Sequence, residues 1–263
     1  FFNDTATTEI YTTLFRSRCR WPDGPIERVF HLAARTFVPD SWKKPEPFYE
    51  TNVLGTVHVL ELCRERGAAL TLFSSYLYGP PERMPIDEQH PVNPFNPYNH
   101  TKILAEEVAH FWNRHFQVPV TVLRPFNPYG PGQPRQFVIP TIVAHLLDPS
   151  CPAVEMETLE PKRDFIYFED VVEAAVLTLG CDGGIYNVAS GSSASVQELA
   201  HLLMEVSGIQ KPIRARGQLR PNEVMDITGD SARLRRDLGW APRTPLREGL
   251  RRVVDSMRAA HKI

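Results

Sequence analysis

Short apolar segments alternate with amphipathic segments along this sequence from residue 26 onward. The apolar segments, each of a length typical of a buried strand, are 28–33, 69–73, 118–123 and 184–188. The amphipathic segments predict long helices at 48–66 and 99–115, and shorter helices near 136–147, 170–179 and 195–206. Strands that alternate with helices usually form a parallel sheet covered by helices. The pattern therefore predicts an α/β fold.

Apolar side chains at helical spacing indicate which face of each long helix is buried. The stripe of the first helix consists of Val53, Val57, Leu60 and Cys63. The stripe of the second helix consists of Leu104, Val108, Phe111 and Trp112. Gly67 supplies the stop of the first helix. We expect both stripes to pack against the sheet.

A tyrosine and a lysine, Tyr98 and Lys102, stand four residues apart at the start of the second helix. Residues at this spacing share one helix face, so the phenol and the ammonium group lie side by side. A nearby cation lowers the pKa of a tyrosine, which is about 10 in water. Such a pair is able to move a proton on or off a sugar or alcohol hydroxyl. Because the same spacing often marks an unrelated surface pair, the neighbouring motifs decide its meaning.

Those motifs are VFHLAA at 29–34, NVLGT at 52–56, SSYLYG at 74–79, YNHTK at 98–102, RPFNPYGPG at 124–132, RDFIY at 163–167, RPNEV at 220–224 and LGWAP at 238–242. Through them the chain resembles the extended short-chain dehydrogenase/reductase family, the sugar-nucleotide epimerases and dehydratases. The resemblance covers residues 26 to about 255. It implies a Rossmann-type parallel sheet with a smaller C-terminal substrate-binding lobe. NAD or NADP is the implied cofactor, and a nucleotide-diphosphate sugar is the implied partner.

The resemblance also implies roles for single residues. The catalytic residues are Ser74, Tyr98 and Lys102, with Ser74 four residues before Tyr78. The cofactor-binding residues are these three together with Leu32, Ala33, Ala34, Asn52 and Pro125. The substrate-binding residues are Asn127, Phe137, Val138, Arg163 and Arg220. The two arginines suit a diphosphate, because guanidinium binds phosphate oxygens bidentately.

One motif of the family is missing from the sequence. The family begins with a strand, a glycine-rich turn (GxxGxxG) and a helix whose N-terminus binds the pyrophosphate. Nothing of that kind precedes Val29, and the first glycine is Gly24. We therefore expect residues 1–20 to be unassigned and non-native, 21–130 to form a partial dinucleotide-binding domain without its first strands, and 131–263 to form the substrate-binding lobe, with 184–188 returning to the main sheet. A catalytically inactive sugar-nucleotide-binding fragment is the alternative to an enzyme.

A second departure concerns the reaction. Sugar-nucleotide 4,6-dehydratases of the family carry an acidic pair just after the catalytic serine or threonine, and here Ser75 and Tyr76 stand in those places. Elimination of water then lacks its general acid. The sequence favours a 4-epimerase or a 4-keto reductase, and a 4,6-dehydratase is the alternative. Residues 137–138 and 219–224 resemble the GDP-mannose dehydratase and GDP-6-deoxy-mannose reductase branch, whereas the general core resembles UDP-hexose 4-epimerases equally well.

Composition excludes several other classes. A formal net charge of −2 provides no field that attracts nucleic acid, and no apolar run reaches the roughly 18 residues that span a membrane. The four cysteines and nine histidines form no metal-binding pattern, so we expect no metal. Free thiols are typical of a reducing cytoplasm. On the resemblance we expect a homodimer with a four-helix interface formed by helices 48–66 and 99–115.

Overall fold

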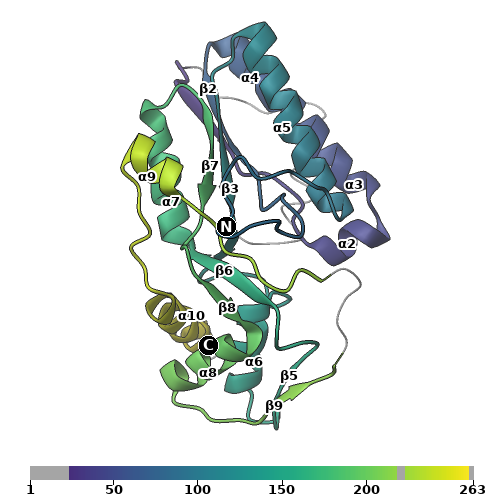
Figure 1. Ribbon diagram of the computed structural model, residues 1–263, viewed down its shortest axis with the longest axis vertical. Coiled ribbons are helices and arrows are strands. Elements are labelled where there is room, and N and C mark those ends of the chain that lie inside the picture. The colour runs from purple at the N-terminus through teal and green to yellow at the C-terminus, as the bar shows by residue number, and fades with distance from the viewer. Residues whose placement is uncertain (1–23, 218–222, 261–263) are drawn as a thin grey trace.

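The computed structural model describes residues 24–217 and 223–260. Within these residues the main sheet has four parallel strands in the order β1, β2, β3, β7 (Figure 1). They are β1 (Arg28–His31), β2 (Ala69–Phe73), β3 (Val120–Pro125) and β7 (Gly184–Val188). The predicted α/β fold with a parallel sheet is confirmed. Residues 1–20, which we expect to be non-native, lie outside the described residues.

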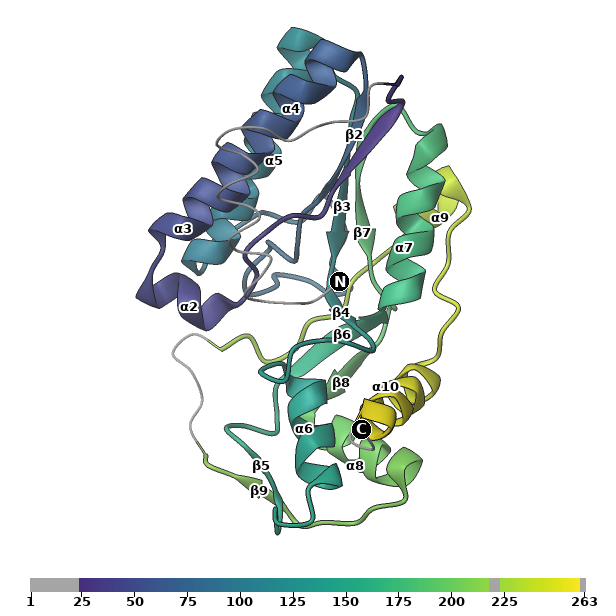
Figure 2. The ribbon, with the colours of Figure 1, turned by 180° about the vertical axis from the view of Figure 1, so that it is seen from behind.

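One face of this sheet is covered by α4 (Gly55–Arg66) and α5 (Pro97–Phe116) (Figures 1 and 2). Leu72 of β2 packs there with Leu60 of α4 and Ala105 of α5 in one buried cluster. Because successive strand residues point to opposite faces, the next residue of each strand faces the other way.

The opposite face is covered by α7 (Phe168–Leu177), the short 3-10 helix η2 (Thr178–Gly180) and α9 (Ala232–Leu238) (Figure 2). Leu123 of β3 and Trp240 belong to the buried cluster on this side. A central sheet buried on both faces explains why its strands read as continuous apolar runs.

A helical segment leads from β1 into α4. The short α2 (Val38–Lys43) is followed by α3 (Glu46–Tyr49), which continues through the π-helical turn η1 (Glu50–Leu54) into α4. Gly67 ends α4 in the left-handed conformation, with φ of 64°, as the sequence predicts. The widened turn η1 carries Asn52, and such turns frequently lie at functional sites.

The apolar stripe predicted for α5 is wrong in part. Phe111 is 50% exposed, and the residues of α5 that are fully buried are small, such as Ala105 and Ala109, or polar, such as Lys102 and Glu106. Small side chains let the helix lie close to the strands, and the larger apolar side chains are consequently displaced to its flank.

A smaller lobe lies below the main sheet in Figure 1. Its three-stranded sheet has the order β4 (Asn127–Tyr129), β6 (Lys162–Tyr167), β8 (Ser193–Ser195), with β6 and β8 antiparallel. A separate parallel pair consists of β5 (Val154–Met156) and β9 (Ile213–Ala215).

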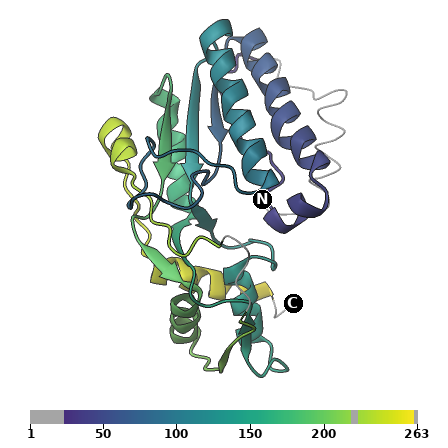
Figure 3. The ribbon, with the colours of Figure 1, turned by 45° about the vertical axis from the view of Figure 1, so that its right-hand side comes forward.

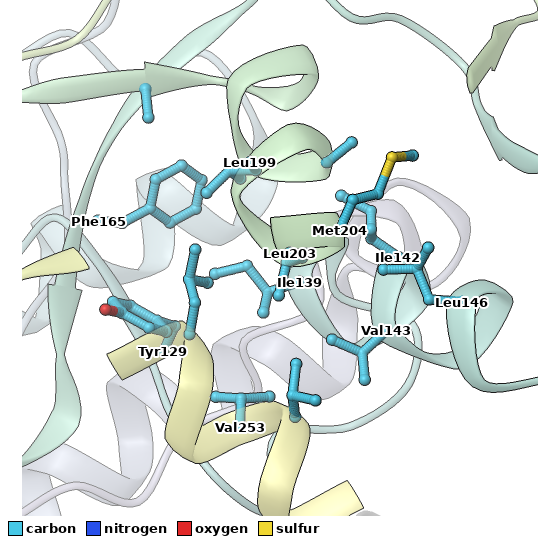
Figure 4. Close-up of a cluster of buried hydrophobic side chains, with 14 of the residues drawn as sticks. Tyr129, Ile139, Ile142, Val143, Leu146, Phe165, Leu199, Leu203, Met204 and Val253 are labelled. Carbon is cyan, nitrogen blue, oxygen red and sulfur yellow. The ribbon is translucent and has the colours of Figure 1, made fainter. Parts of the chain in front are cut away.

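Three helices enclose the core of the lobe: α6 (Val138–Leu147), α8 (Val196–Ser207) and α10 (Leu246–Ala260). Figure 4 shows their apolar side chains gathered into one cluster, among them Ile142, Leu203 and Val253. The chain enters the lobe after β3 and returns in β7, which pairs with β3. The lobe is thereby attached at the carboxyl edge of the main sheet.

Candidate active site

The first turn of α5 holds Tyr98 beside the end of β2. Asn96 caps the helix by accepting a hydrogen bond from the backbone N–H of Asn99 at 2.8 Å, and Pro97 takes the first helical position, which needs no N–H. The side chain of Asn99 donates to the backbone oxygen of Tyr76 at 2.8 Å. These bonds tie the start of the helix to the loop after β2, so Tyr98 has a fixed place at the strand end.

Tyr98 is 8% exposed, and the side chain of Ser75 lies close enough to its hydroxyl to act on its pKa. Burial raises the pKa of Tyr98, and the side chain of Ser75 lowers it by less. The pKa therefore lies above its ordinary value, whereas the sequence predicts a lowered one. The physical reason is that a buried phenolate loses its hydration, and in this arrangement no charge contact makes up for that loss.

Lys102 lies one turn further along the same face and is 4% exposed. Its Nζ donates to the backbone oxygen of Phe73 at the end of β2. Burial lowers the pKa of Lys102 to about 8, and the carboxylate of Glu106 acts in the opposite direction. His31 of β1 faces the same group, and burial together with the charge of Lys102 lowers its pKa to about 3. A neutral imidazole thus adjoins the lysine at neutral pH.

The two serines that follow β2 have different surroundings. The backbone N–H of Ser74 donates to the backbone oxygen of Leu123 at 2.7 Å and so extends the sheet. Its side chain is 6% exposed, and its Oγ has no hydrogen-bond partner among the described residues. The contact to Tyr98 comes from Ser75. The sequence assigned the catalytic role to Ser74 by its spacing from Tyr78, and that role stays a prediction.

The residues predicted to bind the cofactor lie at the carboxyl ends of β1 and β3, the edge where open parallel sheets bind ligands. Leu32 is exposed, Ala33 and Ala34 are half-buried, and Pro125 is buried as the last residue of β3. Short side chains allow a ligand to approach the backbone, and the buried Oγ of Ser74 still lacks a partner. The set fits the nicotinamide end of a dinucleotide. The glycine-rich turn of the family would precede β1, where the structure describes only residues 24–27.

Asn52 has a supporting position between two elements of the site. Its Oδ1 accepts from the backbone N–H of Arg35 at 2.8 Å, and its Nδ2 donates to the backbone oxygen of Arg35 at 3.1 Å and to Thr101 Oγ1 at 2.9 Å. The amide group is thus fully paired within the protein. Asn52 holds the segment after β1 against α5, which fixes the two sides of the predicted cofactor site.

Three predicted substrate residues lie where the lobe meets the main sheet. Asn127, in β4, is half-buried and donates from Nδ2 to the backbone oxygen of Asp164 at 3.0 Å. Phe137 precedes Val138, the first residue of α6, and its ring meets that of Phe37 edge-on with centroids 5.9 Å apart. Since Phe37 precedes α2, this contact joins the lobe to the segment after β1.

Arg163, the next predicted substrate residue, is engaged by other groups of the protein. It forms an ion pair with Glu223 and donates to the backbone oxygen of Val224 at 2.6 Å. A substrate phosphate at Arg163 would therefore compete with the carboxylate of Glu223. Arg220 lies outside the described residues.

Comparison with known proteins identifies the family. Residues 23–253 match the family model described as GDP-mannose 4,6 dehydratase. The chain belongs to this family. Its members among the relatives are NAD(P)-dependent epimerases, reductases and dehydratases of nucleotide sugars, so the predicted resemblance is confirmed.

The similarity extends over most of each relative. The GDP-6-deoxy-D-mannose reductase of Pseudomonas aeruginosa is 31% identical, over 89% of this chain and 81% of the relative. A putative UDP-glucose 4-epimerase of Methanocaldococcus jannaschii is 32% identical, over 89% of this chain and 77% of the relative. The solved structure of MoeE5 in complex with UDP-glucose and NAD is 32% identical, with a TM-score of 0.83 over 90% of this chain and 80% of that one. Similar solved structures hold NADPH or NAD, which agrees with the predicted cofactor.

The positions where dehydratases of the family carry their acidic pair are occupied by Ser75 and Tyr76. The hydroxyl of Tyr76 donates to the backbone oxygen of Gly79, and burial raises its pKa above the ordinary range. Neither side chain supplies a carboxylic acid. The two positions that follow Ser74 therefore place no carboxylic acid beside Tyr98.

Two further findings concern only the part of the chain that the structure describes. No helix in them is long and apolar enough to span a bilayer. They also contain no cluster of three or more His, Cys, Asp or Glu side chains placed to bind a metal ion.

Proposed function

We propose that this chain acts at C4 of a nucleotide-diphosphate sugar, as a 4-epimerase or a 4-keto reductase that uses NAD or NADP. The observation that carries the proposal is the buried phenol of Tyr98, which lies beside Ser75 and one helical turn from the buried Lys102. The names of the relatives support the substrate class, since they include a GDP-sugar reductase and UDP-glucose 4-epimerases.

Tyr98 exchanges the proton of the sugar's C4 oxygen in this mechanism. A bound nicotinamide would supply the hydride chemistry at C4. Lys102 would hold its ribose hydroxyls and stabilise the phenolate, and a serine at the end of β2 would hydrogen-bond the C4 oxygen. Proton transfer of this kind is worth about 10²–10⁴-fold in rate, and orientation of the reactants contributes more.

The protonation state of Tyr98 supports one direction of the reaction. With its pKa raised by burial, Tyr98 carries its proton at neutral pH. A protonated phenol donates to a carbonyl oxygen, which is the step that reduction of a 4-keto sugar needs. Oxidation of a 4-hydroxyl would require Tyr98 to lose this proton first, so the protonated phenol is suited to the reductive step and has to be deprotonated for the oxidative one.

The substrate lies between the sheet edge and the lobe in this proposal. Asn127, Phe137 and Val138 line the sugar side, and Arg163 and Arg220 bind the diphosphate. Glu223 neutralises Arg163 until the phosphate replaces it. The alternatives are a 4,6-dehydratase, which Ser75 and Tyr76 make unfavourable, and an inactive fragment that binds the sugar nucleotide alone.

Thermal unfolding with NAD⁺, NADPH, UDP-sugars and GDP-sugars tests binding first. A ligand present at 100 times its Kd stabilises the protein by about 2.7 kcal/mol. Epimerase and NADPH-oxidation assays then follow with Tyr98→Phe, which should abolish turnover and spare sugar-nucleotide binding. Tyr49→Phe, which removes a phenol that bonds His100 instead, is the matched control. Turnover retained in Tyr98→Phe would refute the assignment, and a sugar-nucleotide response without any cofactor response would favour the inactive fragment.

We further propose a homodimer with a four-helix interface and a cytoplasmic location. The helices α4 and α5 lie side by side on the outside of the sheet (Figure 3), and the exposed apolar side chains of Phe111 and Phe116 lie on α5. The location is supported by the free thiols of Cys63 and Cys181. Light scattering that gives the mass of one chain at all concentrations would contradict the dimer.

A further inference from the structure

A buried ion pair lies one turn beyond Lys102 on the same side of α5. The carboxylate of Glu106 accepts two hydrogen bonds from Arg124, from Nε to Oε1 at 3.0 Å and from Nη2 to Oε2 at 2.6 Å. The side chains of Arg124 and Glu106 are 5% and 9% exposed. Removing two charges from water this completely is costly, and the mechanism above uses neither group.

The ion pair is held in place by a chain of hydrogen bonds. Arg124 Nη1 donates to the hydroxyl of Tyr78 at 3.0 Å, and that hydroxyl donates to Asn187 Oδ1 at 2.6 Å. Asn187 Nδ2 donates in turn to the backbone oxygen of Ile86 at 2.9 Å. The guanidinium also lies 5.1 Å from the centre of the Tyr78 ring. The carboxylate of Glu106 consequently has one fixed orientation.

Groups from three elements act near the ammonium of Lys102. The backbone oxygen of Phe73 in β2 accepts its hydrogen bond, and the imidazole of His31 in β1 is affected by its charge. On α5, Tyr98 and Glu106 stand one turn before and one turn after Lys102, and Arg124 of β3 pairs with Glu106. His31 and Tyr98 are uncharged at neutral pH, as their shifted pKa values require. Of these groups, Glu106 carries the only negative charge; it is one helical turn from Lys102 and is shared with the positive charge of Arg124.

We propose that Glu106, fixed by Arg124 and Tyr78, is a positioning residue that keeps Lys102 protonated in its buried site. The catalytic meaning of this inference rests on the proposed function, because a neutral amine neither stabilises a phenolate nor holds ribose hydroxyls as a cation does. The charge of Lys102 itself is measurable without any substrate. The two ideas are therefore open to separate refutation.

The test is a pH titration of the lysine side chains by NMR, with ¹³C-labelled lysine. Lys102→Met identifies the Lys102 signal. In the parent protein this signal should titrate with a midpoint near pH 8, where burial places the pKa of Lys102. Glu106→Gln should lower the midpoint by about one pH unit, the size of the effect of a close opposite charge. Glu107→Gln, the same change at the adjacent exposed residue, should leave the midpoint unchanged.

Two further variants guard against loss of the fold, since Glu106→Gln leaves Arg124 unpaired. Glu106→Asp keeps the charge and should restore the parent midpoint. Glu106→Gln combined with Arg124→Met removes both charges, which buried sites often tolerate, and should still lower the midpoint. An unchanged or raised midpoint in either folded Gln variant overturns the proposal. A lowered midpoint in a protein that turns over no sugar nucleotide supports the inference and rejects the proposed function instead.

Once a substrate is known, turnover adds a second readout. The alkaline limb of kcat should move to lower pH in Glu106→Gln by the same amount as the NMR midpoint, whereas loss of fold alone would lower kcat equally at every pH. A limb that stays in place despite a lowered midpoint would show that the charge of Lys102 does not limit turnover.

Discussion

Replacement of Ser75 by alanine should lower turnover more than the same replacement at Ser74, because the side chain of Ser75 lies beside Tyr98. The side chain of Ser75 lies beside the hydroxyl of Tyr98, whereas the Oγ of Ser74 is buried without a partner among the described residues. A hydrogen bond to a group that becomes charged is worth about 1.5–3 kcal/mol. Each 1.36 kcal/mol of barrier is a factor of ten, so Ser75→Ala should lower kcat about 10- to 150-fold.

The effect of Ser74→Ala on stability should have the opposite sign from that of an ordinary core truncation. A buried hydroxyl that lacks a partner costs about 1–3 kcal/mol, and alanine removes it. For a chain of this length about 1 kcal/mol corresponds to about 2–4 °C in Tm. Ser74→Ala should therefore melt a few degrees above the parent protein.

Scanning calorimetry of both variants, and kcat with the sugar nucleotide and cofactor that give the highest rate, complete the test. Each variant is the control of the other, because the two positions differ by one residue and carry the same substitution. If Ser74→Ala loses turnover and Ser75→Ala keeps it, Ser74 and not Ser75 acts together with Tyr98. The assignment predicted from the spacing to Tyr78 would then be correct.

Two further predictions concern stability. Burial lowers the pKa of His31 from 6.5 to about 3. The neutral imidazole therefore contributes to the free energy of unfolding fully above pH 6.5, and this contribution is lost as the pH falls towards 3. The loss is at most about 5 kcal/mol, at 1.36 kcal/mol per pH unit. Denaturant unfolding between pH 6.5 and 3 should show this loss of free energy. His31→Leu should remove most of the pH dependence, whereas His201→Leu, at an exposed position, should keep it. An equal pH dependence in all three proteins would contradict the reasoning. A Cβ at Gly249 of α10 would lie 2.2 Å from Tyr129 Oη, so Gly249→Ala should destabilise by about 1–3 kcal/mol through overcrowding. Gly180→Ala, where no atom lies within 4 Å, should stay within error of the parent, and equal melting of the two variants would count against the close contact.

Local sequence patterns predicted the elements of the sheet well. The strands at 69–73 and 184–188 were placed to the residue, because apolar runs of strand length bounded by Gly or Ser leave few other choices. Gly67 ends α4 as expected, since only a residue that tolerates positive φ suits that position. The same patterns were only partly right for α5, where Val108 and Trp112 pack against the core but Phe111 is exposed. The buried face of α5 depends on how closely the helix approaches the strands. The spacing of apolar residues along the sequence carries no information about that distance.

The site shows the same division. The sequence by itself determined that Tyr98 and Lys102 share a helix face, that polar residues gather at the ends of parallel strands, and that the chain resembles nucleotide-sugar epimerases and dehydratases. These follow from chemistry and spacing along one segment of chain. The tertiary structure alone decided that Ser75 contacts Tyr98, that Arg163 pairs with Glu223, and that burial raises the pKa of the phenol instead of lowering it. The hydration that a side chain loses and the partners that it gains depend on groups that are far apart in the sequence. Only the packed fold brings these groups together.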